Sequence, residues 1–256
     1  MKRKEPMADT QVVDIKQLFE AGAHFGHKTS RWHPKMAPYI HSKRGGVHVI
    51  DLNRTVDCLN TALEFVSKLS ADNKQILLVG SKRQAKDIIN KLSEDTGMPY
   101  VTGRWLGGTL TNWSTIGGRV THMKDLEEKM ANGEIANKYN KLEVQRFQEE
   151  IEQLNTNYGG IKELHGKPAA VFVVDTNHDH IAIKEANKLG IPVIAMIDTN
   201  SDPTTIDYPI PANDDAIKSI QLIADYLKAA IETGKAKIKP VEKEDKEAKE
   251  EKEEDK

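Results

Sequence analysis

The stretch AAVFVVDTNHDHIAIKEANKLGIPVIAMID (residues 169–198) contains a strand, a helix and a second strand in outline. It opens with a β-branched apolar run, AAVFVVD at 169–175, and closes with a second, IPVIAMID at 191–198. Between them a polar turn, DTNHD, leads into a helical pattern. Gly190 ends that pattern just before Pro192, which is the usual signal for a helix stop. Two near-continuous apolar strands joined by a helix predict a parallel pair that is buried on both faces.

The same alternation extends outward from this unit. QILLVG (75–80) and GVHVID (46–51) are further candidates for buried strands, and MPYVT (98–102) is a shorter one. A helical pattern follows most of these runs, and the last pattern, from Asp214 to Thr233, repeats apolar residues at three- and four-residue intervals. This order predicts an α/β fold: a parallel sheet of about five strands flanked by helices, flavodoxin- or Rossmann-like.

Helix starts are marked by side chains that can cap them. Asn53 or Thr55 is expected to cap the helix after 46–51, and Ser81 the helix after 75–80. The acids of NDD at 213–215 are expected at the start of the last helix, where its dipole favours negative charge.

The alternation is interrupted between Trp113 and Leu164. Two helical patterns lie here, each with one narrow apolar seam, and a glycine-containing break separates them. They predict an antiparallel coiled-coil hairpin that projects from the body. We therefore expect an α/β domain over 1–112 and 160–235, a hairpin insertion over 113–159, and a charged, disordered tail over 236–256.

The net charge of −2 hides an uneven distribution. The last sixteen residues hold nine acids and five lysines, a local charge of −4 that leaves +2 for the rest of the chain. This tail is expected to be a solvated spacer or to touch a basic neighbour. A single cysteine, Cys58, excludes an internal disulfide, and no apolar run reaches the roughly 20 residues of a membrane span. The start, MKRKEPMADTQ, lacks the apolar core of a signal peptide, so we expect a soluble cytoplasmic protein.

The turn LLVGSKRQAKD resembles a phosphate loop because a glycine follows a strand and two cations follow the glycine. It lacks both GxxxxGK[ST] and GxGxxG, which argues against nucleotide binding. Lys82 and Arg83 are expected to open a helix, where two cations can contact a nucleic-acid phosphate.

The polar turn DTNHD raises the question of a metal or catalytic site. His178 and His180 are two residues apart, whereas metal ligands on one helix need a spacing of three or four. Asp198 ends an apolar strand and is expected near Asp214 and Asp215, where a histidine such as His24 would complete a structural site for a divalent ion. No nucleophile stands in a signature turn.

The most basic block is HFGHKTSRWHPKMAPYIHSKR (24–44), which contains five cations, four histidines and no acid. Interleaved cations and aromatic rings are typical of segments that grip structured RNA through phosphates and unstacked bases. Glycines and prolines are expected to keep the segment an irregular ribbon, and a solvated loop is the alternative. The residues expected to contact RNA here are His27, Lys28, Arg31, Trp32, His33, Lys35, Lys43 and Arg44, followed by Arg54.

GRWLGGTLTNW (103–113) is a second candidate for RNA contact. Arg104, Asn112 and, beyond the segment, Arg119 supply polar groups at the base of the hairpin. Trp105 and Trp113 are expected either to stack on RNA or to pack in the core. The hairpin itself is acid-rich, which argues against a large RNA contact along its length.

Several motifs occur in an order that resembles one known family. They are AGAHFGHKTSRWHPKMAPYI, HVIDLNRTV, RWLGGTLTNW, VDTNHDHIAIKEANKLGIPVIAMIDTNSDP and IPANDDAIKSI. Together they resemble the second ribosomal protein of the bacterial small subunit, over about residues 10–233. The resemblance implies a sheet of about five parallel strands with an inserted coiled-coil hairpin. It also implies binding to small-subunit ribosomal RNA on the solvent side, near where head meets body.

The resemblance has further implications for partners and residues. Members dock the multi-OB-fold first protein of the small subunit and catalyse nothing. The RNA-facing motif corresponds to 24–28, Arg31, Trp32 and Lys35, and the RWLGG motif to 104–108. We therefore expect a structural, RNA-binding constituent of the ribosome that supports translation, with no cofactor, membrane or small-molecule substrate. The rival is a metal- or nucleotide-dependent enzyme that uses Asp175, His178, His180 and Asp198.

Overall fold

The fold is organised around one parallel sheet. The structure is a computed structural model that describes residues 13–254; for Ala136 and residues 238–254 it describes the backbone alone. The five strands follow the order β5-β4-β6-β7-β8, and every pairing is parallel. Their bounds are Ile76–Val79 (β4), Tyr100–Val101 (β5), Ala170–Val173 (β6), Val193–Ile197 (β7) and Tyr208–Pro211 (β8). The fold class expected from the sequence is confirmed.

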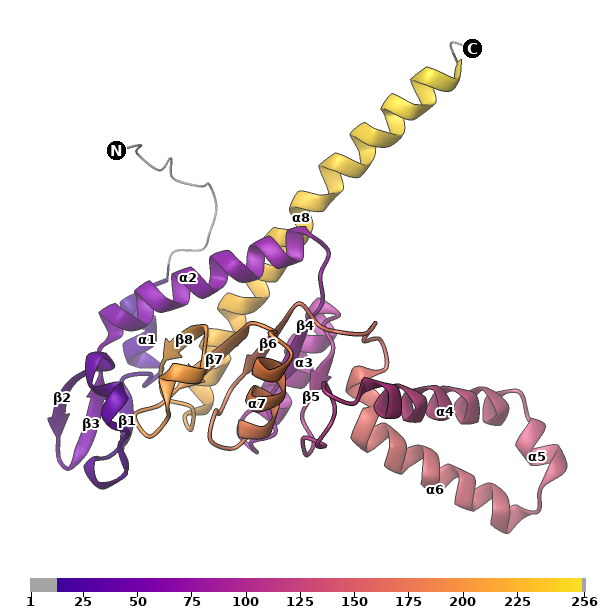
Figure 1. Cartoon of the computed structure of the whole chain (residues 1–256), viewed down its shortest axis with the longest axis horizontal. Coiled ribbons are helices and arrows are strands. Elements are labelled where there is room, and N and C mark those ends of the chain that lie inside the picture. The colour runs from indigo at the N-terminus through magenta and orange to yellow at the C-terminus, as the bar shows by residue number, and fades with distance from the viewer. Residues whose placement is uncertain (1–12, 255–256) are drawn as a thin grey trace.

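Both faces of the sheet are covered, as near-continuous apolar strands require. Alternate side chains of β4 point to opposite faces: Ile76 joins one buried cluster and Leu77 the other. The first cluster also contains residues of four helices, and the second contains residues of α7 and of the base of the hairpin (Figure 1). The four helices are α1 (Ile15–Glu20), α2 (Leu52–Ala71), α3 (Lys86–Thr96) and α8 (Ile217–Glu254), and α7 is His180–Lys188.

The run at 46–51 does not join the parallel sheet, contrary to the sequence prediction. Its strand β3 (Val47–Ile50) lies between β1 (Phe25–Lys28) and β2 (Ile40–Arg44) in a separate antiparallel sheet of three strands. Gly45 and Gly46, with φ of 57° and 78°, form the two-residue turn that pairs β2 with β3. Strand β8 takes the fifth place in the parallel sheet.

This small sheet also replaces the irregular ribbon expected for residues 24–44. Between β1 and β2 the chain forms two short 3-10 helices, Thr29–Arg31 and Pro34–Tyr39. We call residues 25–50 the N-terminal sheet. It lies at one end of the molecule, and the helical hairpin projects from the opposite end (Figure 1).

The hairpin lies where the apolar seams predict it. It consists of α4 (Trp113–Ala131), a short α5 (Glu134–Lys138) and α6 (Lys141–Tyr158). Asn140 and Glu143 form a reciprocal capping box at the start of α6. The seam of α4 is buried and that of α6 is half-buried, so the two helices pack along the predicted stripes. Two further 3-10 helices, Gly159–Ile161 and Pro203–Thr205, belong to the body.

Helix ends differ from prediction at three places. Asp51, rather than Asn53 or Thr55, caps α2. Helix α3 begins at Lys86, so neither Ser81 nor the two residues after it start the helix. Helix α8 continues to Glu254, through the tail expected to be disordered; lysine, glutamate and alanine have high helix propensity, which favours this continuation. Residues 1–12, 255 and 256 of the predicted outer segments lie outside the described residues.

None of the helices in residues 13–254 combines the length and the apolar character that a membrane crossing requires.

Candidate nucleic-acid interface

The N-terminal sheet is attached to the carboxyl edge of the parallel sheet through Thr199. The carbonyl of this buried residue accepts a hydrogen bond from the amide of His33 at 2.7 Å, and its hydroxyl oxygen accepts one from the amide of His27 at 2.8 Å. Gly26 lies directly against the Thr199 side chain. A Cβ added at Gly26 would stand 2.5 Å from the Thr199 methyl and 2.8 Å from Thr199 Oγ1, and both distances are too short for a contact.

Gly26→Ala should therefore loosen the N-terminal sheet. Overpacking at such a site costs about 1–3 kcal/mol, and we expect a matching loss in the free energy of unfolding together with weaker RNA binding. Chemical denaturation and RNA binding measure the two effects. Gly118→Ala, in an exposed helical position with open space around it, is the control and should be neutral or slightly stabilising. Equal behaviour of the two variants would contradict this attachment.

The N-terminal sheet presents four cations to solvent. None of them lies within ion-pair distance of a carboxylate among the side chains that the structure describes, and all four are exposed: Lys28, Arg31, Lys43 and Arg44. Lys28 and Arg44 both pair in register with Val47, so they share one face of the sheet, while Lys43 pairs with His48 on the other. Both faces of this end of the molecule are therefore cationic.

Two residues predicted to bind RNA have an acidic partner that the local sequence does not contain. Lys35 Nζ lies 3.1 Å from Asp202 Oδ2, and His33 Nε2 lies 3.9 Å from the same atom. Hydrogen bonds from Thr204, and then the contact with Lys35, lower the pKa of Asp202 to about 2. The charge of Lys35 is thus partly balanced within the protein, and we expect it to contribute less to phosphate binding than the four unpaired cations.

His27 and Lys82 point into the body rather than to a ligand. His27 Nδ1 lies 3.0 Å from Asp198 Oδ2, and this carboxylate raises the pKa of His27. Lys82 Nζ lies between three carboxylates, at 3.0 Å from Asp175, 2.9 Å from Asp214 and 2.7 Å from Asp215. Burial disfavours the charged form of Lys82, but these acids outweigh burial and raise its pKa above the usual value. RNA contact by these two residues stays a prediction, and their ion pairs make us expect less phosphate binding from them than from the four unpaired cations.

The same contacts replace the metal site that the sequence allowed at Asp198 and Asp214. The ammonium of Lys82 neutralises the carboxylates, and His24 is stacked on Phe19, with 4.4 Å between ring centroids, instead of facing them. Within the described residues, no group of three or more histidine, cysteine or acidic side chains is arranged to hold a metal ion. Where the sequence left a structural ion possible, Asp214 pairs with a lysine that lies 132 positions away in the sequence.

Asp214 gives this cluster a testable pH dependence. Burial, with help from the carboxylates of Asp175 and Asp198, raises the pKa of Asp214 to about 7 from 3.8. The folded state holds this proton more tightly than the unfolded chain does. The stabilising contribution is therefore complete below about pH 4 and is lost as the pH rises through about 7.

Asp214→Asn removes this titration. The free energy of unfolding of the wild type, relative to that of the variant, should fall between pH 4 and pH 7 by up to about 1.4 kcal/mol per pH unit. Denaturant titrations across this range measure the difference. Asp125→Asn, on the exposed surface of α4, should follow the wild type throughout. A pH-independent difference between the wild type and D214N would contradict the raised pKa.

Glu185 on α7 positions the second predicted RNA segment. Its carboxylate accepts hydrogen bonds from the indole of Trp105 (3.2 Å) and from the backbone amides of Gly108 (2.7 Å), Leu110 (3.0 Å) and Thr111 (3.0 Å). Burial alone would raise the pKa of Glu185, but the backbone donors, with Gly108 first, lower it below its usual value. Sequence reasoning gave Glu185 no role in positioning this loop; a single acid on the buried face of a helical pattern was the available signal.

The residues of this segment divide between core and surface. Trp105 is buried, so of the two roles left open for it, packing is correct. Trp113 is half-buried against the same cluster. The polar residues predicted to contact RNA from this part of the chain are all exposed: Arg104, Asn112 and Arg119. Two other predicted contacts, Arg54 and Arg83, are exposed as well.

The side chains of the rival enzyme are held in structural contacts. Ser81 Oγ lies 2.6 Å from His178 Nδ1 and 2.5 Å from Asp179 Oδ1, so serine stands between histidine and acid. A catalytic triad needs the histidine between the other two, where it can take the serine proton. His180 Nδ1 contacts the backbone carbonyl of Asn177 at 3.1 Å. None of these contacts forms an activated nucleophile.

Comparison with known proteins identifies the family of the chain. A family model described as Ribosomal protein S2 matches residues 18–234. The chain belongs to the ribosomal protein S2 family. It is 48% identical to small ribosomal subunit protein uS2 of Fusobacterium nucleatum subsp. nucleatum over 231 residues, which is 90% of this chain and 94% of the relative. The uS2 proteins of Roseiflexus sp. (strain RS-1) and Syntrophobacter fumaroxidans are 49% and 46% identical, over 87% and 91% of this chain and 85% of each relative.

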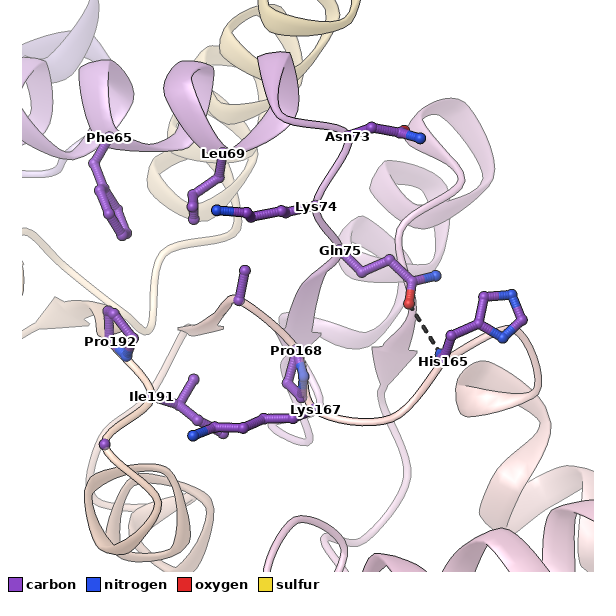
Figure 2. Close-up of a pocket in the computed structure, with 12 residues that line it drawn as sticks. Phe65, Leu69, Asn73, Lys74, Gln75, His165, Lys167, Pro168, Ile191 and Pro192 are labelled. Carbon is purple, nitrogen blue, oxygen red and sulfur yellow. Dashed lines mark hydrogen bonds between the residues drawn. The ribbon is translucent and has the colours of Figure 1, made fainter.

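The molecule also has hollows on its surface. One hollow, of about 810 Å³, lies at the opposite, amino edge of the parallel sheet, between Leu69 of α2 and Ile191 before β7 (Figure 2). Its wall is bridged by a 3.0 Å hydrogen bond from the amide of His165 to Gln75 Oε1. No residue predicted to bind RNA lines this hollow.

Proposed function

We propose that this protein is a structural constituent of the small ribosomal subunit in cytoplasmic ribosomes and that its N-terminal sheet binds small-subunit ribosomal RNA. The observation that carries this proposal is the set of four exposed cations without a described acidic partner, next to the exposed side chain of Trp32. Cations neutralise backbone phosphates and release counterions, while aromatic rings accept unstacked bases. The relatives' names support the ribosomal assignment.

The remaining contacts extend the interface beyond the N-terminal sheet. Arg54 lies in the first turn of α2, shortly after β3, and Arg104 and Arg119 lie on either side of the start of α4. Arg83, in the turn after β4, is a further exposed cation. The helix-covered sheet holds these separate segments at fixed positions, which suits a surface where several RNA helices converge. We assign the protein no catalytic role.

The salt dependence of binding tests this function. Affinity for small-subunit ribosomal RNA should fall linearly on a log–log plot against salt, by about 0.7–0.9 log units for each phosphate contact. With four contacts from the N-terminal sheet alone, the slope should be about −3 or steeper. Filter binding at several salt concentrations gives the slope. A slope near zero, or no binding at low salt, would rule out the proposal.

We also propose a docking surface for the multi-OB-fold first protein of the small subunit. Three apolar side chains are 44%, 59% and 54% exposed although they are large: Ile15, Phe19 and Phe25. His24 lies between the two phenylalanine rings, with centroid distances of 4.4 Å and 4.0 Å, and burial lowers its pKa. We call these four residues the aromatic patch. Contiguous exposed apolar side chains are typical of surfaces that contact another protein.

Phe19→Ser together with Phe25→Ser should remove the first protein from assembled subunits while leaving RNA binding within about twofold of the wild type. The reason is that exposed apolar anchors carry much of the binding free energy of a protein interface. Sedimentation of subunits, followed by quantification of the first protein, measures the loss. Exposed Leu142→Ser on the hairpin is the matched control. Retention of the first protein by the double variant would remove the aromatic patch from this role.

A further inference from the structure

Trp32 has an unusual position among the tryptophans of this chain. Its side chain is 41% exposed, whereas Trp105 is 6% exposed and Trp113 is half-buried. It stands on the N-terminal sheet, with its ring 5.2 Å from the ring of His48 and tilted by 40°. An indole left in water loses the stabilisation that burial would provide, so its exposure points to a partner that covers it.

A hollow of about 340 Å³ opens beside this ring. Its volume is within the range of small-ligand pockets. It combines an aromatic face, an apolar floor, two hydroxyl groups and one ammonium group. The lining residues are Trp32, His48, Ala37, Ile40, Thr29, Ser42 and Lys43.

His48 supplies an independent sign that the hollow takes a polar ligand. The residue is 7% exposed and lines the hollow, yet neither ring nitrogen has a hydrogen-bond partner. A buried polar atom without a partner is destabilising, and such atoms in native proteins usually mark a missing water, ion or ligand. Both nitrogens are shielded from solvent, so bulk water does not satisfy them either.

We propose that this hollow, which we call the Trp32 hollow, receives one unstacked nucleobase of the bound RNA. The base stacks on the indole of Trp32, and its polar edge meets His48 and the hydroxyl groups of Thr29 and Ser42. This inference rests on the proposed RNA-binding function and adds a base-binding site to it. A base fits better than a peptide because the unpaired cation Lys43 lines the hollow and exposed Arg31 precedes Trp32 in the chain, so that cations are available for the phosphates on either side of an unstacked base.

The test compares stacking with charge. Filter binding of intact small-subunit ribosomal RNA is measured over a range of salt for the wild type, Trp32→Ala, Trp32→Phe and Lys43→Ala. W32A should bind the RNA roughly 5- to 100-fold more weakly at every salt concentration, because one stacked base is lost, and the salt slope should not change. W32F keeps a ring and should bind nearly as well as the wild type. K43A should instead reduce the slope by about 0.7–0.9.

Two further variants guard against indirect effects. Ser42→Leu fills the hollow from β2 without removing the indole and should weaken binding as W32A does. Tyr139→Ala removes another exposed aromatic ring, at the far tip of the hairpin, and should have no effect. Thermal unfolding within a few degrees of the wild type confirms that each variant is folded.

The outcomes separate this inference from the proposed function. If the wild type binds RNA and the affinity of W32A is within twofold of the wild-type affinity, the base site is overturned and RNA binding stands. Equal loss of affinity in W32A and W32F leads to the same conclusion. If W32A keeps its RNA affinity but a neighbouring protein is lost from the subunit, the hollow binds a protein, and this result also overturns the inference. Absence of wild-type binding overturns the function itself.

Discussion

Replacing Lys28, Arg31, Lys43 and Arg44 together with alanine should weaken binding to small-subunit ribosomal RNA by about 100- to 1000-fold at roughly 0.1 M salt. The salt slope should lose about three units, because each phosphate contact contributes about 0.7–0.9. The physical reason is that these cations are exposed and have no acidic partner among the described side chains, so nothing within that part of the protein offsets their charge.

The matched control removes the same charge elsewhere. Lys91, Lys129, Lys184 and Lys188 are exposed on α3, α4 and α7, away from the N-terminal sheet. Their quadruple alanine variant should keep at least the greater part of the wild-type slope. If both quadruple variants lost affinity equally, binding would follow net charge alone and the N-terminal sheet would have no special role.

The second large effect concerns folding. Glu185→Ala should lower the free energy of unfolding by about 3–5 kcal/mol, because it leaves several buried donors without an acceptor. For a chain of this size that corresponds to a decrease in melting temperature of roughly 10 °C. Glu185→Gln retains one acceptor oxygen but places an amide group against other donors. The free energy of unfolding should therefore fall by about 2 kcal/mol. Thermal and denaturant unfolding measure both.

Glu94→Ala is the control for this experiment, since Glu94 is an exposed glutamate on α3 and should change stability by less than about 0.5 kcal/mol. The structure further predicts that E185A weakens RNA binding, because Arg104 and Asn112 lie in or beside the loop that Glu185 holds. A fully stable E185A variant would show that the loop is fixed by packing of Trp105 alone.

Local patterns in the sequence were sufficient for most of the fold. Near-continuous apolar runs correspond to buried strands of the structure. Gly97 and Gly190 lie at helix ends, and the two narrow apolar seams correspond to the helices of the hairpin. The fifth strand of the parallel sheet is β8 instead of the run at 46–51, and this difference has a physical explanation. GVHVID is apolar enough to be buried, but a glycine pair ahead of it favours a hairpin with β2. The edge strand β8, Tyr208–Pro211, contains two prolines, and for that reason the sequence pattern did not predict it as a strand.

The interface was less accessible because its electrostatics depend on distant residues. Lys35 and Asp202 are 167 positions apart, and Lys82 and Asp214 are 132 apart. No local pattern predicts which cation stays unpaired and which forms an ion pair within the protein. The role of Glu185 likewise appears only when α7 and the loop after β5 are brought together. The exposed cations at 28, 31, 43 and 44 were predictable because their neighbours in sequence contain no acid.

Lysine acetylation footprinting of the small subunit is the most direct test of where the RNA lies. Lys28 and Lys43 should react readily in the isolated protein, be protected in the assembled subunit, and become reactive again once nuclease removes the RNA. Lys184 and Lys188 should react equally in all three states. Equal labelling of Lys28 and Lys43 in the isolated protein and in the intact subunit would contradict the central claim that the N-terminal sheet binds ribosomal RNA.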